Sequence, residues 1–207
     1  MSDDSLQALP HSLKEKYSVA PNNVSLIGLQ KIRVLGVLGK KEFVRKIAAN
    51  LALQLAALYC YTDVKLCFVM RPGEENYFAW ARPLPHARWQ ENKIRLMCAN
   101  ETERQNVLFY LNGALRVRAE AADLNKHENI MQLPHVFIFC THPDLISRDN
   151  ISRFMSDEKA GGVTFVLLYE KFDLLPNECT HVIQWDGYYS GVCRLDEARD
   201  NPSATKN

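Results

Sequence analysis

The chain has 207 residues, 47% of them hydrophobic, which suits one large globular domain that buries its own core. Its 25 lysines and arginines nearly balance 24 acidic residues, so the chain lacks the basic excess typical of nucleic-acid-binding domains. It contains no run of about 18 apolar residues and no basic leader followed by an apolar stretch, so neither a transmembrane helix nor a signal peptide is predicted.

The first elements in chain order are a strand, a long helix and a second strand. Residues 32–38 form a β-branched run that ends at Gly39 and predicts a buried strand. Apolar residues recur at helical spacing from Lys40 to Tyr59, which predicts a helix. The second half of this helix is apolar nearly all round, which predicts deep burial of residues such as Leu51. The run from 64 to 70 then predicts a second buried strand.

A turn, a third strand and a second helix follow. The segment "EENYFAWARPL" ends at prolines and predicts a short helix or turn, and residues 93–99 predict a strand. Asn100, with Glu103 three residues later, has the pattern of a capping box, so a helix is expected from there to about Arg118. Residues 119–134 are polar and broken, which predicts a loop or a frayed helix end.

The last third of the chain contains four more strands. The apolar runs "HVFIFC" and "VTFVLLY" predict buried strands, with a helix between them that stops at two glycines. The runs "THVIQW" and "GVCRL" predict a final antiparallel pair.

Together these elements predict an α/β fold. Near-continuously apolar strands that alternate with helices are typical of a mostly parallel sheet covered by helices on both faces. We expect a P-loop-ATPase-like domain of this kind at residues 24–197, ending in an antiparallel hairpin. Residues 1–23 are expected to form an N-terminal extension and residues 198–207 a disordered tail. Ligands of such folds bind at the carboxyl ends of the strands, so the loop after the first strand is the first candidate site.

That loop has the layout of a degenerate phosphate-binding turn. Its order of strand, glycines, lysine and helix is that of a P-loop, and the candidate residues are Gly36, Gly39, Lys40 and Lys41. A working P-loop reads GxxxxGK[ST]. Here Val34 stands in place of the first glycine, and Lys41 in place of the magnesium-binding hydroxyl. Two interpretations stay open: an anion site at a helix N-terminus, or a tight turn with solvated lysines.

The sequence shows no assembled catalytic constellation. The carboxylate that helps an ATPase to hold magnesium is expected after a buried strand, and "HVFIFC" is the natural candidate. Thr141 and His142 follow that strand, with no carboxylate before Asp144. The GxSxG pattern of a serine nucleophile is also missing. We therefore predict no catalytic residues, no resident cofactor and no ATP hydrolysis above background.

The six cysteines are interpreted as reduced thiols. No two of them have CxxC spacing and most lie in apolar runs, so buried free thiols explain them better than disulfides do. Cys140 and His142 would lie on one side of a strand, but no second pair of ligands stands nearby, so no metal site is expected.

A turn near the C-terminus carries two tyrosines. The glycines of "WDGYYSG" place Tyr188 and Tyr189 at its tip, where both cannot fold onto one core face. Exposed tyrosines are enriched at interfaces, so these two are candidate interaction residues. In the alternative, one ring covers the sheet edge and the other is solvated. Trp80 and Trp89 flank a Leu-Pro-His turn and are expected to pack against the sheet.

Several stretches together resemble one protein family. They are "IRVLGVLGKKEFVRKIAANLALQLAALYCYTDVKLCFV", "WARPLPHARWQENKIRLMCANETE", "LPHVFIFCTHPDLI" and "LLPNECTHVIQWDG", in this order over residues 24–195. In these features the chain resembles the ATPase-like domain between the membrane segments and motor domains of FtsK/SpoIIIE-type ATPases of type VII secretion systems. The active motors of that family have a full P-loop and an acidic strand end. This chain has Val34, Lys41 and Cys140 there, which disfavours hydrolysis but not the fold.

The resemblance implies a role in protein secretion. It predicts a non-catalytic module at the cytoplasmic face of a bacterial membrane, within a larger ATPase, that couples the membrane part to the motor domains. Expected partners are other domains and copies of the same ATPase and other membrane components of the machinery, and nucleic acid is not expected. Two alternatives stay open: a nucleotide-binding protein with an unorthodox site, and a regulatory protein that binds a partner through exposed aromatic residues.

Overall fold

The computed structural model describes residues 27–89, 94–123, 133–147, 150–156, 161–185 and 190–194. The N-terminal extension and the C-terminal tail expected from the sequence lie outside these ranges.

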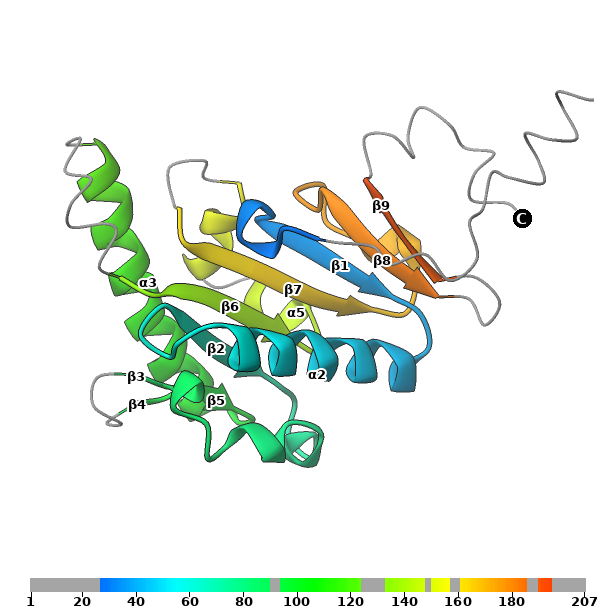
Figure 1. Cartoon of the computed structure of the whole chain (residues 1–207), viewed down its shortest axis with the longest axis horizontal. Helices are drawn as coiled ribbons and strands as arrows, with labels where there is room; N and C mark the ends of the chain where they lie inside the picture. Colours follow the sequence, from blue (N-terminus) through cyan, green and yellow to red (C-terminus); the bar gives the residue numbers. More distant parts are fainter. Residues whose placement is uncertain are drawn as a thin grey trace, which may run out of the picture.

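The centre of the fold is a seven-stranded sheet in the order β5-β2-β6-β7-β1-β8-β9 (Figure 1). Six neighbouring strands are parallel, and only β9 runs antiparallel, against β8. The predicted α/β class and its final hairpin are thus confirmed. In chain order the strands are β1 (Val34–Leu38), β2 (Val64–Val69), β5 (Met97–Cys98), β6 (His135–Cys140), β7 (Val163–Tyr169), β8 (His181–Trp185) and β9 (Ser190–Arg194).

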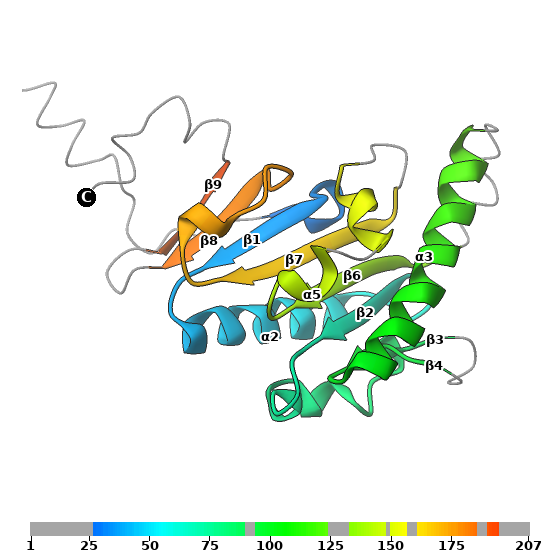
Figure 2. The ribbon, with the colours of Figure 1, turned by 180° about the vertical axis from the view of Figure 1, so that it is seen from behind.

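Helices cover both faces of the sheet, as the sequence predicted (Figure 2). On one face lies α2 (Lys41–Leu58), and on the other lie α3 (Glu101–Asp123), α5 (Asp144–Ser147) and the 3-10 helix η5 (Asn150–Met155). Every residue of β1 and β7 is buried, because each strand has a neighbour on both edges and helices or loops on both faces.

The first long helix occurs where the sequence predicted it, but its second half is less buried than expected. α2 packs on the sheet through one stripe that includes Val44, Ala48, Ala52 and Leu55. Leu58 is 75% exposed and Leu51 only partly buried. A single helix on an open sheet face buries one side only, so its other apolar residues face solvent.

The second long helix begins with the predicted cap and runs further than predicted. Asn100 Oδ1 accepts the backbone N–H of Glu103 at 2.9 Å, and Glu103 Oε2 accepts the N–H of Ala99 at 3.1 Å. α3 ends at Asp123 instead of near Arg118. Arg118 is buried and donates hydrogen bonds to the carbonyls of Gly162 (2.6 Å) and Pro134, which fixes this part of the helix to the sheet.

The third predicted strand is divided between two sheets. Its first part, β4 (Ile94–Arg95), pairs antiparallel with β3 (Arg88–Trp89) in a small separate sheet, and its second part is β5. Leu96, between the two parts, donates its N–H to the carbonyl of Ala87. The backbone changes partner there, which the continuous apolar pattern could not reveal.

The remaining connections are short and largely 3-10. The segment after β2 forms three turns. The two tryptophans that flank its Leu-Pro-His turn pack against core residues, Trp80 near Phe68 with ring centroids 6.3 Å apart and Trp89 near Tyr110 at 5.8 Å. The helix predicted between β6 and β7 is replaced by the short α5 and η5. The other 3-10 elements are η1 (Leu29–Lys31), η2 (Glu75–Tyr77), η3 (Ala79–Ala81), η4 (Pro85–Ala87) and η6 (Phe172–Leu174).

Candidate functional site

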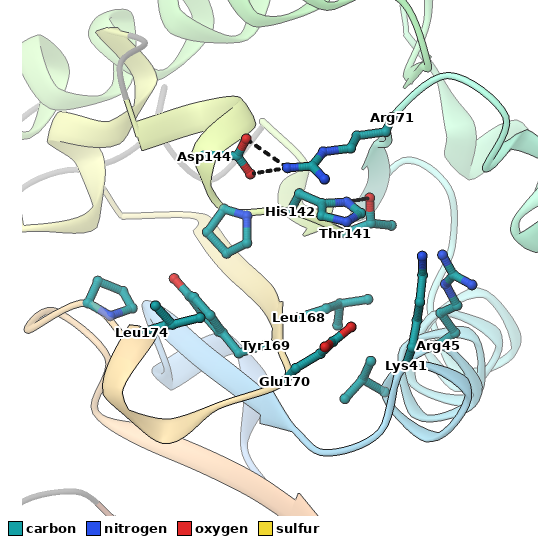
Figure 3. A pocket seen from close by; sticks show the side chains of 13 residues that line it. Lys41, Arg45, Arg71, Thr141, His142, Asp144, Leu168, Tyr169, Glu170 and Leu174 are labelled. Carbon is teal, nitrogen blue, oxygen red and sulfur yellow. Dashed lines mark hydrogen bonds and ion pairs between the residues drawn. The ribbon is translucent and has the colours of Figure 1, made fainter.

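A cleft of about 530 Å³ opens at the carboxyl edge of the sheet. Lys41 and Arg45 of α2 stand on one side, Leu174 on the other, and Thr141 and His142 lie between them at the end of β6 (Figure 3). The chain leaves β1 toward the face of α2 but leaves the adjacent β7 toward the opposite face. Ligand sites of open α/β sheets occur at such switch points.

The predicted phosphate turn is shorter than the sequence indicated. Gly36 lies inside β1, paired with Leu167 and Val182, so the turn itself consists of Gly39 and Lys40. Gly39 has a φ of +148°, which favours glycine. Gly36 has another role: a Cβ there would lie 2.8 Å from Cδ2 of Leu175, so its absence lets the loop before β8 pack against the strand.

The two lysines of this turn face different surroundings. Lys41 is the first residue of α2 and lines the cleft, whereas Lys40 is the exposed N-cap residue and does not. The Lys40 carbonyl accepts the N–H groups of Phe43 and Val44 at 2.8 and 3.1 Å. The earlier N–H groups of the helix have no acceptor within it, as at any helix start.

A buried glutamate, Glu74, binds several side chains on the side of the cleft nearest α2. It is 7% exposed and accepts hydrogen bonds from Arg45 (2.5 Å), the Thr141 hydroxyl (2.7 Å) and the backbone N–H of Arg71 (3.2 Å). His142 Nδ1 lies 3.3 Å from Glu74 Oε2 and 3.0 Å from Thr141 Oγ1. We call Glu74, Arg45, Thr141 and His142 the Glu74 network.

This network was not recognised from the sequence. Glu74 stands in a Pro-Gly-Glu-Glu turn, where an acidic residue is ordinarily solvated. One feature of the sequence could have indicated it. Arg45 lies on the buried stripe of α2 next to Val44, and an arginine on an otherwise apolar helix face needs a buried partner because an unpaired buried charge is costly. Its guanidinium also lies 3.5 Å from the centre of the Tyr77 ring.

The network sets the ionisation of its members. Burial raises the pKa of the Glu74 carboxyl, but the hydrogen bonds from Thr141 and the Arg71 backbone, with the charge that His142 carries at acidic pH and the charge of Arg45, outweigh burial, so the pKa lies below its usual value. Burial lowers the pKa of His142, and the neighbouring Glu74 carboxylate offsets this only in part. Near neutral pH the network therefore holds a charged glutamate and a neutral histidine.

At the end of β6, one residue lies in the core and a later one lines the cleft. Cys140 is fully buried, and its thiol donates to the backbone carbonyl of His142 at 3.1 Å. Burial raises the pKa of this thiol. Asp144, the first carboxylate after the strand, is exposed and forms an ion pair with Arg71, whose Nη2 donates to both carboxylate oxygens at 3.0 and 3.1 Å. Neither position presents an uncommitted carboxylate to the cleft.

The cations that line the cleft are thus already partnered. Arg45 pairs with Glu74, Arg71 pairs with Asp144, and Lys41 Nζ lies 3.7 Å from Glu74 Oε1. In a phosphate site such cations would be directed at the ligand. Here the cleft neutralises most of its own positive charge.

The sequence analysis also made predictions about metal ligands, cysteines, the tyrosine turn and membrane spans. Within the residues that the structure describes, no group of three or more histidine, cysteine or carboxylate side chains could hold a metal ion. Five cysteines have described side chains, and all are free: Cys60 is exposed and the other four are buried. Tyr188 and Tyr189 lie outside the described residues. No helix among the described segments is long and apolar enough to span a bilayer.

The fold and the position of the cleft define an open α/β domain with a candidate ligand site at the carboxyl edge of its sheet, and proteins of type VII secretion systems are similar to it. No protein-family model matches the chain. The chain is similar to the type VII secretion system protein EssC of Staphylococcus aureus, 22% identical over 152 residues, and to the ESX secretion system protein YukB of Bacillus subtilis, 23% identical over 159 residues. These matches cover 72% and 76% of this chain and 10% of each relative, so the chain spans about a tenth of their length.

Solved structures show the same fold. ATPases 2 and 3 of EssC from Geobacillus thermodenitrificans match 74% of this chain, which covers 32% of that structure, with a TM-score of 0.55 at 13% identity. The cytoplasmic domain of EssC matches 72% of this chain, which covers 31% of that structure, with a TM-score of 0.54, also at 13% identity. The resemblance to an ATPase-like domain of type VII secretion ATPases, noted from the sequence motifs, is thus confirmed.

Proposed function

We propose that this chain is a non-catalytic, ATPase-like module of a type VII secretion motor protein. In this proposal it lies at the cytoplasmic face of the membrane, between the membrane part and the motor domains, transmits motion between them and contacts other copies of the motor. Similarity to one tenth of EssC and YukB supports a modular role within a larger protein.

The observation that carries the proposal is that the three cations lining the cleft are already paired with the carboxylates of Glu74 and Asp144. Glu74 is the buried carboxylate nearest the start of α2, and it is engaged by Arg45, Thr141 and the Arg71 backbone. A nucleotide site needs a carboxylate and a hydroxyl directed at magnesium, and cations directed at phosphate. Lys41 occupies the place of that hydroxyl, and the buried Cys140 the end of the relevant strand.

A nucleotide-binding role without turnover is the second candidate. A cleft of about 530 Å³ has the volume of a small-molecule site. Lys41 is half-exposed at a helix start, where an anion is stabilised. Such a ligand would compete with Glu74 for Lys41 and Arg45, so we expect weak binding.

Two measurements on the purified chain test these functions. Steady-state hydrolysis of magnesium–ATP should not exceed background. Turnover near 1 s⁻¹, the low end of typical enzyme rates, that is lost in Lys41→Ala and kept in Lys40→Ala would overturn the proposal. This pair is matched because only Lys41 lines the cleft. Calorimetric titration with magnesium–ATP then separates the two candidates, since saturable binding sensitive to Lys41→Ala supports only the second.

A further inference from the structure

The outer face of α3 carries three residues that no described part of the chain covers. Phe109 is 81% exposed, Val117 is 59% exposed, and Gly113 lies between them, four residues from each. Residues four apart lie on the same side of a helix. We call Phe109, Gly113 and Val117 the α3 ridge. The helix packs on the sheet through the opposite side, which includes Leu108, Leu111 and Leu115.

No described neighbour explains the glycine of the α3 ridge. A Cβ at Gly113 would meet no atom within 4 Å, so no neighbouring element needs the space. Glycine inside a helix is less favourable than alanine, because it loses more backbone entropy on folding. A glycine between two exposed apolar side chains does, however, let a second helix approach the backbone closely.

We propose that the α3 ridge pairs with the same ridge of a second copy of this chain, in an antiparallel helix pair centred on Gly113. The pattern is self-complementary: the larger Phe109 stands four residues before the glycine, and the smaller Val117 four residues after it. A two-fold axis at Gly113 sets Phe109 against Val117 of the partner subunit, and the reverse, with the two glycines at the crossing point.

The polar residues beside the ridge fit this arrangement. At 1.5 Å rise per residue, Arg116 and Phe109 of the partner subunit lie on the same side of the axis, about 4.5 and 6 Å from it. The two residues are therefore offset by only about 1.5 Å along the helices, and a guanidinium close to an aromatic face is attracted to it. Glu120 lies level with Asn106 of the partner subunit, so a carboxylate meets an amide donor. Among the described residues of the single chain, Arg116 and Glu120 are exposed and form an ion pair with each other at 3.2 Å.

A parallel pair in register is disfavoured by the same residues. It would set Arg116 against Arg116 of the partner subunit and Glu120 against Glu120 of the partner subunit, and like charges that face each other are repulsive. It would also oppose the two Phe109 rings and leave space between the two Val117 side chains. Size and charge therefore both favour the antiparallel orientation.

The pair should be weak. One helix crossing buries less surface than the roughly 1,600 Å² of a standard interface. Self-association of the full 207-residue chain should therefore be measured by sedimentation equilibrium, from micromolar to the highest soluble concentration. Reversible dimer formation is expected. A monomer at every concentration would overturn the proposal.

Two ridge variants and one matched control locate the interface. Phe109→Ser should weaken dimerisation at least tenfold. Gly113→Gln should do the same while it raises the Tm of the monomer by a few degrees, because glutamine is the better helix former. That opposite effect on stability excludes unfolding as the cause of lost association. Leu53→Ser removes an apolar side chain that is 51% exposed on α2 and should leave dimerisation unchanged. Dimerisation unaffected by both ridge variants contradicts the proposal.

Disulfide trapping tests the orientation. In a Cys60→Ser background, Gly113→Cys should cross-link two copies readily under oxidised glutathione, since the two positions meet at the axis. Val117→Cys should not, because antiparallel helices hold these positions about 12 Å apart along their axes. Equal cross-linking of both variants would indicate a parallel pair and would refute the antiparallel one.

Discussion

The replacement Glu74→Gln tests whether the Glu74 network stabilises the fold. Glutamine keeps the size of the side chain but removes the charge, and it leaves the guanidinium of Arg45 without its counterion. The side chains of Arg45 and Glu74 are only 10% and 9% exposed, so water cannot readily replace the lost partner. Removal of one member of a buried ion pair costs roughly 3–5 kcal/mol. Because Glu74 lies just beneath the cleft, we expect about 3 kcal/mol.

A second replacement distinguishes the loss of the ion pair from the cost of burying an unpaired Arg45 charge. Arg45→Met in the Glu74→Gln background removes the unpaired cation and keeps an apolar chain of similar length on the buried stripe of α2. The double variant should therefore be more stable than Glu74→Gln alone, by about 1–2 kcal/mol, the size of a coupling between contacting residues. Its recovery should be incomplete, since the guanidinium also stacks on Tyr77 at 3.5 Å.

Urea unfolding with linear extrapolation gives these free energies. The matched control is Asp144→Asn, which breaks the ion pair with Arg71 at the rim of the same cleft. Those side chains are 63% and 50% exposed, so the loss should be about 0.5 kcal/mol or less. If Glu74→Gln costs no more than Asp144→Asn, the network is solvated and our account of it is wrong.

Three further predictions follow from single residues. Burial, with the charge of Arg118, lowers the pKa of His135 to about 4, so between about pH 6.5 and pH 4 the unfolded chain binds a proton that the folded chain does not. Stability should fall by up to about 3 kcal/mol as the pH drops through that window, and His135→Gln should flatten this dependence. Gly36→Ala should cost about 1–2 kcal/mol in urea unfolding, because its Cβ would overlap Leu175; a neutral result would show that the loop yields freely. Cys60 is exposed and its pKa is lowered, chiefly by a hydrogen bond with Thr62, so it should react with a thiol reagent well before the buried cysteines, and Cys60→Ser should remove the fast phase.

Much of the fold could be predicted because its strands and helices are continuous in sequence. The runs that became β1, β2, β6 and β7 are five to seven residues long and almost entirely buried, so they are apolar at all but a few positions, namely Lys65, His135 and Thr164. The cap of α3 could be predicted equally well, because Asn100 and Glu103 are only three residues apart and their hydrogen bond forms within one helical turn. Patterns of this kind need no knowledge of the tertiary structure.

The features that escaped prediction depend on contacts between distant segments. Leu96 donates its N–H to Ala87, and that contact divides one apolar run between two sheets. Glu74 becomes a buried anion only when Arg45 and Thr141, from two other elements, reach it. The role of Gly36 in β1 escaped prediction for the same reason. Its sequence pattern indicated a phosphate turn, but the space above it is filled by a loop that lies far along the chain. Only the assembled sheet brings these groups together.

The central position of β1 has a consequence for how the chain folds. This first strand is hydrogen-bonded to β7 on one edge and β8 on the other, and both belong to the last third of the sequence. Joining such distant segments closes long loops before their contacts become stabilising, which slows folding. During synthesis, β1 must therefore remain without a sheet neighbour until residues 163–169 of β7 have emerged. The cleft is one of the last parts to form, although the helix that begins it is made early.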